Sequence, residues 1–362
     1  MAADSLKFGI ACNRFGAGGG LERYALDIAA AIAARSPRPV AVYARKFDAT
    51  EAGGKTIEAH RINVSLLPGK WRDHVFSWRL QSLKRHSDVL IGCNRVRGAD
   101  LAICGGTHRG YLAARGKAPS LADRWQIRLE SDQYAGASTV VAHSALMRSE
   151  LVSLYGMAED RIALLYPPVD TRRFTPVDGS ERQALRRRHG FADDEVVFLF
   201  PSSGHARKGL DLLARHFAAL HVESNLRVTL AVAGRPVGRT LPRVREMGYV
   251  REIESLYRAA DYTVLASDYE PFGLVGVESV LCGTPLVFAD NIACLEVIAP
   301  EAVLPFSRTD DDSVAAALRE AVRRVRDGQV RIDAPLSLLR YDPDVGRHAE
   351  ALMALAEKAR QR

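Results

Sequence analysis

Short apolar runs alternate with amphipathic stretches along most of this 362-residue chain. Runs of this kind predict buried strands, and an apolar face that repeats every three to four residues predicts a helix. Strands that alternate with helices are typical of a parallel, doubly wound α/β sheet. In the first half the predicted strands are Leu6–Asn13, Val40–Arg45, Asp88–Cys93, Asp100–Cys104 and Ser138–Ala142. Two helices are predicted there. One has Leu21, Ala25, Ile28 and Ile32 on its apolar face, and the other is Ser144–Tyr155.

The alternation stops at Tyr166–Pro168 and begins again at Glu195. Two successive prolines can continue neither a helix nor a central strand, so we expect a domain boundary there. The chain is predicted to form a Rossmann-like domain at residues 1–166, a second at residues 167–342, and a helix within residues 343–362 that packs back across the domains. In the second half the predicted strands are Glu195–Pro201, Arg227–Gly234, Tyr262–Ala266 and Pro285–Ala289, and the predicted helices are Gly209–Leu220, Ile253–Ala260 and Leu274–Leu281.

Composition indicates the class of protein and the cellular compartment to expect. Hydrophobic residues make up 47% and charged residues 26% of the chain, as in ordinary globular domains. No apolar run approaches the roughly 20 residues of a membrane-spanning helix, and the stretch MAADSLKFGIAC lacks the pattern of a signal peptide. The five cysteines show no metal-ligand spacing and are typical of buried thiols in a reducing compartment. We therefore expect a cytoplasmic location.

The basic excess of the chain lies in its first half. Residues 1–165 hold 23 Lys/Arg and 15 Asp/Glu, whereas residues 166–362 hold 27 and 28. The first half is therefore expected to face something anionic: a phosphorylated substrate, an anionic membrane surface or nucleic acid. A basic surface without a partner is the alternative.

Glycines follow the first predicted strand at positions 16, 18, 19 and 20. Glycines before a helix let the backbone approach an anion and offer it free N–H groups. The dinucleotide pattern GxGxxG does not fit, because Leu21 stands where the third glycine belongs. Arg45 and Lys46 at the end of the second strand could still serve an NADP phosphate, and a tight turn without a ligand is a further alternative.

Two further segments follow strands in the second half. Ser202–Gly209 (SSGHARKG) places Arg207 and Lys208 just before a helix, where they could clamp a diphosphate; a solvated basic turn is the alternative. Asp268–Pro285 (DYEPFGLVGVESVLCGTP) places Glu270 ahead of a helix and Glu278 about one turn inside it. Both carboxylates could reach one site and accept hydrogen bonds from sugar hydroxyls, or they could be two unrelated surface residues.

Together these segments resemble the retaining glycosyltransferases of family 4, which have the GT-B fold, two Rossmann-like domains facing across a cleft. Glu270 and Glu278 match the E-x7-E element of that family, and the resemblance covers most of the chain. The other matching motifs, in order, are Gly19–Arg23 (GGLER), Tyr166–Asp170 (YPPVD), Arg207–Asp211 (RKGLD), Ala233–Gly234 (AG), Ala259–Asp261 (AAD) and Cys282–Pro285 (CGTP).

Within the family the chain looks most similar to the lipopolysaccharide core glucosyltransferases, which add glucose to an inner-core heptose. The shared features are Ile91–Asn94 (IGCN), Gly98–Asp100 (GAD) and an arginine directly before Lys208. Two departures accompany them. The stretch Gly105–His108 (GGTH) lacks the aspartate of those enzymes, so the sugar and the acceptor stay open. Ser202 replaces the usual glycine after its strand, which bears on the shape of the phosphate loop.

The resemblance implies a role for each matching position. Glu278 would bind the ribose hydroxyls of a nucleotide, and Glu270 would face the donor sugar. Arg207 and Lys208 would neutralise the leaving diphosphate. The backbone amides of Phe272, Gly273, Leu274 and Val275 would bind the sugar and the diphosphate, and the loop of Tyr249, Val250 and Arg251 would border the base. Gly19 and Gly20 would contact the phosphate. Thr107 and His108 would lie near the reacting sugar.

The sequence thus predicts a retaining glycosyltransferase that moves a hexose from a UDP-sugar, with UDP-glucose favoured by the resemblance, to a lipopolysaccharide core or similar phosphorylated glycan. No metal is expected, because two cations would take its place and no DxD motif lies in a suitable loop. Peripheral attachment to the anionic inner face of the cytoplasmic membrane is expected from the basic first half.

Two other classes remain as alternatives. An NADP-dependent oxidoreductase could use the same type of sheet, but it has no use for Glu270 or Glu278. A nucleic-acid binder could use the basic residues 1–165, but no recognition motif is present there, so no nucleic-acid partner is expected.

Overall fold

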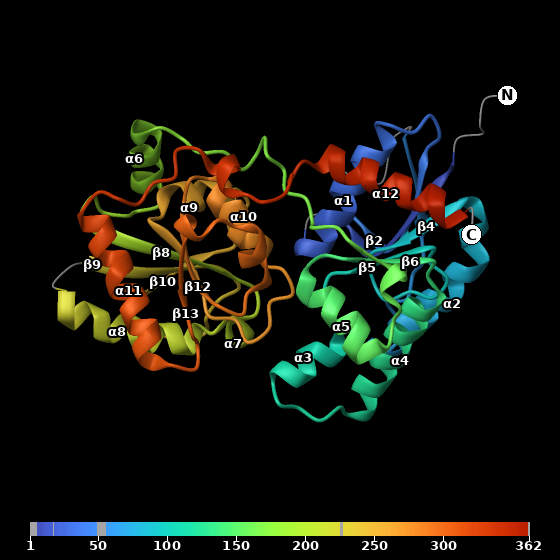
Figure 1. The fold of residues 1–362 in the computed structure, drawn as a ribbon, viewed down its shortest axis with the longest axis horizontal. Coiled ribbons are helices and arrows are strands. Elements are labelled where there is room, and N and C mark those ends of the chain that lie inside the picture. The colour runs from blue at the N-terminus through green and yellow to red at the C-terminus, as the bar shows by residue number, and fades with distance from the viewer. Residues whose placement is uncertain (1–5, 17, 49–55, 225–226, 361–362) are drawn as a thin grey trace. The chain divides into compact units, whose positions relative to one another are not determined.

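The computed structural model describes residues 6–16, 18–48, 56–224 and 227–360. The chain forms two compact units, shown in Figure 1. The first unit consists of Met1–Pro168 together with Pro343–Arg362, and the second consists of Val169–Asp342. The C-terminal segment therefore returns to the N-terminal unit. None of the helices in the described ranges combines the length and the apolar content that a membrane span needs.

The first unit is built on a seven-stranded parallel sheet with the strand order β3-β2-β1-β4-β5-β6-β7. Its strands are β1 (Phe8–Phe15), β2 (Val40–Phe47), β3 (Ile57–Arg61), β4 (Val89–Gly92), β5 (Leu101–Cys104), β6 (Thr139–Ala142) and β7 (Ile162–Leu164). Its helices are α1 (Gly20–Ala33), α2 (Gly69–Leu83), α3 (His108–Ala114), α4 (Leu121–Gly136), α5 (Ala145–Tyr155) and α12 (Val345–Arg360), with short 3-10 turns at Lys84–His86 and Glu159–Arg161.

The second unit is built on a six-stranded parallel sheet with the order β10-β9-β8-β11-β12-β13. Its strands are β8 (Glu195–Ser202), β9 (Arg227–Gly234), β10 (Val244–Gly248), β11 (Tyr262–Leu265), β12 (Leu286–Ala289) and β13 (Val303–Phe306). Its helices are α6 (Gly179–Arg188), α7 (His205–Lys208), α8 (Leu210–Ser224), α9 (Ile253–Ala259), α10 (Leu274–Leu281) and α11 (Asp311–Arg326), with 3-10 turns at Ala293–Val297, Pro300–Ala302 and Pro335–Leu338.

The predicted α/β class is confirmed, and the strands that the sequence missed share one property. They are β3, β7, β10 and β13, which lie at the edges of the two sheets. Hardly any of their residues is fully buried, whereas every residue of β8 is buried. A half-exposed edge strand has no continuous apolar run, so the periodicity that indicates central strands is weak there.

Helix α12 completes the core of the first unit. It packs beside α1, as Figure 1 shows. Ala349, Leu352 and Ala356 are fully buried in the same apolar cluster as Ile28 and Ile32 of α1. Tyr24 of α1 also shares a hydrogen bond of 2.9 Å with His348 Nε2. Burial of the apolar face of α12 thus holds the end of the chain against the first unit.

Each sheet has a point where successive connections turn to opposite sides. In the first unit it lies between β1 and β4, and in the second between β8 and β11. Helices that leave neighbouring strands in opposite directions open a crevice at the carboxyl ends of those strands, and ligands of such sheets bind there. The segments that follow β1, β8 and β11 are therefore candidates for a ligand-binding site.

Candidate active site

The two motifs of the second half meet at the carboxyl edge of the second sheet. β8 leads into α7, and β11 leads through residues 266–273 into α10. The backbone N–H of Asp268 donates to the carbonyl of Arg207 at 2.9 Å, and that of Ala266 donates to the carbonyl of Lys208 at 3.2 Å. Segments about 60 residues apart in sequence are thus joined at the β8–β11 switch point.

Gly209 sets the geometry of this junction. Its φ of 81° is left-handed, and a Cβ at this position would lie 2.3 Å from the carbonyl oxygen of Ala266. Both facts require glycine. The sequence prediction of one helix from Gly209 onward, with the two cations in a loop before it, is corrected: Arg207 and Lys208 end a separate helical turn, α7, and α8 begins at Leu210.

Arg207 and Glu270 form an ion pair in this junction. The Arg207 Nη1 donates to Glu270 Oε2 at 3.0 Å and to the carbonyl of Tyr269 at 2.7 Å. Ser267 Oγ donates to the same carboxylate oxygen at 3.1 Å. The Glu270 side chain is mostly buried, so these donors hold its carboxylate in one orientation. Ser267 was not predicted as a site residue, although it directly precedes the carboxylate motif in sequence.

Lys208 is a buried cation. Its exposed fraction is 7%, and its Nζ donates to the carbonyl of Pro201 at 3.0 Å. Burial lowers the pKa of this ammonium group, and the nearby Glu270 carboxylate opposes that shift. No carboxylate of the described residues lies within ion-pair distance of it. An ammonium group in this setting gains strongly from an external anion.

Glu278 lies in α10 and faces α9. Tyr257 donates its hydroxyl to Glu278 Oε2 at 2.9 Å. Burial, reinforced by the Glu278 charge, raises the pKa of Tyr257 well above its usual value, so the phenol keeps its proton and remains a donor. The Glu278 side chain is partly exposed, which leaves it accessible to a polar ligand. Tyr257 is a further residue that the sequence pattern did not indicate.

The two ends of α10 show why the helix occupies these residues. Its N-cap, Gly273, has a left-handed φ of 92° and offers no side-chain acceptor. The first-turn N–H groups of Leu274 and Val275 have no acceptor within the helix, and together with the helix dipole they favour an anion. At the other end Gly283, with φ of 78°, donates to the carbonyl of Val280 at 2.8 Å and closes the helix.

The remaining predicted residues of the second unit lie at the same edge of the sheet. Tyr249, Val250 and Arg251 directly follow β10. Tyr249 is 78% exposed, and the carbonyl of Arg251 accepts a hydrogen bond of 3.0 Å from Arg173. A large exposed aromatic ring beside the carboxyl end of a strand is available to stack on a planar ligand.

In the first unit the glycine segment leads directly into α1. The helix begins at Gly20, and its N-cap Gly19 makes no side-chain cap. Asn13 at the end of β1 donates its backbone N–H to Asn94 Oδ1 at 2.7 Å, across the β1–β4 switch point. The Asn13 side-chain oxygen is buried and, among the described residues, has no partner. Asn13 and Asn94 are thus polar groups at the switch point of the first sheet, and neither was predicted from the sequence to have a role there.

His108 is the first residue of α3 and is held by α4. Its Nε2 lies 2.8 Å from Asp123 Oδ1, and its backbone N–H donates to Glu130 at 2.9 Å. Hydrogen bonds from Ser120 and then from His108 lower the pKa of Asp123 to about 2. Thr107 caps the helix, because its side chain accepts from the N–H of Gly110. The visible role of His108 is therefore to join α3 to α4.

Two other predictions concern metal and NADP. Among the described residues no group of three or more His, Cys, Asp and Glu is arranged to hold a metal ion. Arg45, one of the two bases that the NADP alternative requires, forms an ion pair with Asp73 and lies over the ring of Phe76. Its charge is thus already matched within the first unit.

Comparisons with known proteins agree with this architecture. Residues 195–324 match the family model "Glycosyl transferases group 1", and residues 18–173 match "Glycosyltransferase Family 4". A "Probable transglycosylase" of Burkholderia thailandensis is 54% identical over 359 residues, which cover 98% of each chain. None of these matches supports an oxidoreductase.

Solved structures share the fold at low sequence identity. WaaG, a glycosyltransferase involved in lipopolysaccharide biosynthesis, superposes with a TM-score of 0.79 at 19% identity over 98% of each chain. Anabaena HepE in complex with UDP-glucose superposes with a TM-score of 0.69 at 17% identity over 98% of this chain and 97% of that one. The family models and the 54% identical relative show that the chain belongs to the family 4 glycosyltransferases, and the solved structures show that it has the GT-B fold.

Proposed function

We propose that this glycosyltransferase is a retaining hexosyltransferase that uses a UDP-sugar, with UDP-glucose as the first candidate. The observation that carries the proposal is the junction of the β8–α7 and β11–α10 segments, which brings Lys208, Arg207 and Glu270 together beside the N-terminus of α10. HepE has been solved with UDP-glucose, and WaaG is involved in lipopolysaccharide biosynthesis. Both proteins support the proposal by analogy of fold alone.

The donor would be bound by charge and hydrogen-bond complementarity. The Lys208 ammonium and the first-turn N–H groups of α10 would hold the diphosphate, because both favour negative charge. Glu278 would accept hydrogen bonds from the ribose hydroxyls, while Glu270 would accept them from the hexose. The base would lie against the loop Tyr249–Arg251. Arg207 would keep Glu270 oriented and share the charge of the leaving group.

The transfer step breaks the bond between the anomeric carbon and a diphosphate oxygen and forms a bond from that carbon to an acceptor oxygen. Positive charge develops on the sugar, and the Glu270 carboxylate would stabilise it electrostatically. The acceptor proton would pass to the departing diphosphate on the same face, which retains the configuration. A double displacement through an enzyme carboxylate is the alternative route.

We further propose that the reaction needs no divalent metal. Lys208 and Arg207 provide two cations within the junction, which is the charge that a bound metal supplies in other transferases. Activity that is unchanged by a chelator, and not raised by Mg²⁺ or Mn²⁺, is the expected result. Loss of activity on chelation that a metal restores would contradict this part.

A glycan donor is the second candidate, because the Burkholderia thailandensis relative is named a probable transglycosylase. The buried Lys208 favours a nucleotide-sugar over a neutral glycan donor, because an ammonium without a carboxylate partner gains most from a diphosphate. Release of UDP in the transfer assay distinguishes the two donors, since a transglycosylase releases a glycan instead.

Calorimetry tests the donor site directly. The protein would be titrated with UDP, UDP-glucose, UDP-galactose, UDP-N-acetylglucosamine and GDP-mannose. We expect a UDP-sugar to bind and Glu278→Gln to weaken its binding about 30-fold, since a carboxylate that accepts two hydroxyl hydrogen bonds contributes roughly 2 kcal/mol. The matched control Glu301→Gln changes an exposed glutamate of the same unit and should bind normally. No binding to any nucleotide-sugar would refute the proposal.

The acceptor is proposed to be a phosphorylated glycan of the lipopolysaccharide core type, reached at the cytoplasmic face of the membrane. The basic excess of residues 1–165 supports this choice. Sedimentation with anionic vesicles should decrease as salt is raised, because surface charges are screened. Sedimentation that is unchanged between low and high salt would contradict peripheral electrostatic attachment.

A further inference from the structure

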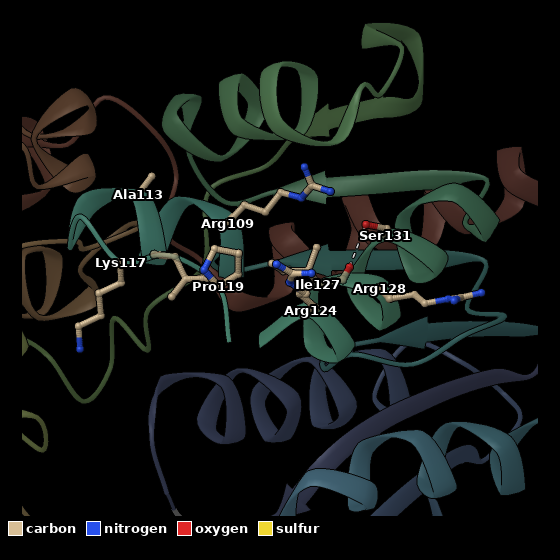
Figure 2. Close-up of a pocket in the computed structure, with 9 residues that line it drawn as sticks. Arg109, Ala113, Lys117, Pro119, Arg124, Ile127, Arg128 and Ser131 are labelled. Carbon is tan, nitrogen blue, oxygen red and sulfur yellow. Dashed lines mark hydrogen bonds between the residues drawn. The ribbon is translucent and has the colours of Figure 1, made fainter. Parts of the chain in front are cut away.

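A pocket of about 660 Å³ lies in the first unit between α3, α4 and the segment that joins them, as Figure 2 shows. Four of its lining side chains are basic: Arg109 of α3, Lys117 of the joining segment, and Arg124 and Arg128 of α4. Among the described residues that line it there is no aspartate or glutamate. The volume suits a small organic ligand, and the charge suits an anion.

The positive charge of this pocket has no matching carboxylate among the residues that the structure describes. The three carboxylates of α4 are held by partners outside the pocket: Asp123 by His108, Glu130 by Arg95 and Asp132 by Arg97. In the part of the chain that the structure describes, Lys117, Arg124 and Arg128 form no ion pair. The remaining base, Arg109, lies with its guanidinium 5.2 Å from the ring centre of Tyr155. An external anion would therefore provide the missing counter-charge.

The rest of the lining is largely apolar. It includes Leu112 of α3, Pro119 of the joining segment and Ile127 of α4. A purely hydrophilic anion would leave this apolar surface unused. The lining thus fits a ligand that joins an anionic group to an apolar body.

We propose that the α3–α4 pocket binds a phosphate ester carried on an apolar or amphiphilic body, and that it is the subsite for the phosphate group of the acceptor. A phosphate monoester carries nearly two negative charges and three acceptor oxygens, which matches several arginines better than a carboxylate would. The assignment to the acceptor rests on the proposed transferase function, whereas the anion binding itself does not.

The position of the pocket supports an acceptor role. α3 follows β5 at the carboxyl edge of the first sheet, and Arg109 directly follows His108. One helix, α3, therefore contributes residues to the lining of the pocket and begins with His108, the histidine predicted from the sequence to face the reacting sugar. A phosphate held by Arg109, Arg124 and Arg128 would anchor the acceptor next to that edge.

Fluorescence titration provides the test, because Trp71, Trp78 and Trp125 all belong to the first unit. The probe is monomeric dihexanoylphosphatidic acid, with dihexanoylphosphatidylcholine and inorganic phosphate as comparison ligands. We expect saturable binding of the phosphatidic acid, weaker binding of inorganic phosphate and none of the phosphatidylcholine. In Arg124→Gln/Arg128→Gln the affinity should fall by about tenfold or more, since charge-assisted hydrogen bonds are lost.

The matched control is Arg61→Gln/Arg85→Gln, which removes the same charge from two exposed arginines of the same unit that do not line the pocket. It should bind the phosphatidic acid like the unmodified protein. An equal loss in both double variants, or no loss in Arg124→Gln/Arg128→Gln, would overturn the proposal, because the anion would then respond to net charge or to another surface.

Two further arms identify the source of the phosphate and separate this proposal from the donor site. If vesicles containing phosphatidic acid sediment the control but not Arg124→Gln/Arg128→Gln, the natural ligand is presented in a bilayer. If the two arginines affect binding of the monomeric probe but not sedimentation with vesicles, the natural ligand is a free phosphorylated acceptor. UDP-sugar calorimetry on the same preparations reports on the second unit, so failure of the donor proposal and failure of the pocket proposal give different results.

Discussion

The two units handle charge differently, although both are parallel α/β sheets. The first unit holds 27 Lys/Arg and 18 Asp/Glu, and the second holds 23 and 25. In the second unit several bases at or near the core are matched to carboxylates within the unit, as in the pairs Arg207–Glu270, Arg186–Asp261 and Arg245–Glu195. In the first unit the cations of the α3–α4 pocket lack such partners among the described residues.

The difference indicates two ways in which a protein can recognise an anion. Paired charges fix the orientation of the groups around a reaction, because each ion is held by a partner and a hydrogen bond. Unpaired surface cations attract an anion from a distance, and this attraction weakens strongly as salt is raised. We infer that the second unit orients the donor, whereas the first unit collects an acceptor.

The largest expected effect concerns Lys208, a buried base of the second unit that lies outside these ion pairs. Lys208→Met removes the buried charge while retaining most of the side-chain volume. We expect kcat/KM with a UDP-sugar to fall by about 10³, roughly 4 kcal/mol, because the charge would act on the developing diphosphate. Arg187→Met, an exposed base of the same unit, is the control and should retain activity.

Circular dichroism of Lys208→Met separates loss of charge from loss of fold. The fold should survive, since replacing a buried ammonium by an apolar chain relieves a desolvation cost. A folded Lys208→Met protein that binds UDP with unchanged affinity would show that the ammonium does not act on the diphosphate.

The next effect concerns the glycine that joins the two motifs of the second unit. Gly209→Ala should lower the free energy of unfolding by about 3 kcal/mol, because it adds left-handed strain and a backbone collision. Gly190→Ala is the matched control: its φ is 72°, but nothing lies within 4 Å of an added Cβ, so it should cost only about 1 kcal/mol.

Urea denaturation measures both glycine variants. Circular dichroism reports on both units, whereas tryptophan fluorescence reports on the first. We expect Gly209→Ala to shift the dichroism transition and not the fluorescence transition. Equal costs for the two variants would mean that the contact with Ala266 does not constrain the junction.

The smallest expected effect is on the pH dependence of the stability of the first unit. Burial lowers the pKa of His143 to about 3 and that of His348 to about 4, below the value of about 6.5 in an unfolded chain. Between those values the unfolded chain binds protons that the folded first unit does not, so stability is complete above about pH 6.5 and falls as the pH is lowered. Each histidine contributes a slope of roughly 1 kcal/mol per pH unit in that window.

Acid titration followed by tryptophan fluorescence measures this slope in the first unit. His348→Gln can keep a hydrogen bond to Tyr24 but does not titrate, so stability between about pH 4 and 6.5 should depend less on pH. An acid midpoint identical to that of the unmodified chain would show that His348 does not cause the acid sensitivity.

Local pattern was sufficient for the elements that are buried on both faces. The predicted bounds of β9 and α10 agree with the structure, because Arg227–Gly234 is an apolar run and Leu274–Leu281 is closed by Gly283 and Pro285. The edge strands escaped prediction, since half-exposed residues carry weak periodicity. α3 and α4, which carry the basic pocket, also escaped, and α4 has little separation of apolar and polar faces.

The amino-acid sequence by itself determined the α/β class, the GT-B resemblance and the residues Glu270, Glu278, Arg207 and Lys208 as candidates, because these follow from local spacing and residue chemistry. Only the tertiary structure decided that Arg207 pairs with Glu270, that Lys208 is buried against Pro201, and that the bases of α3 and α4 line one pocket. Those relations depend on contacts between segments far apart in the chain, which strand order and packing create and local periodicity does not contain.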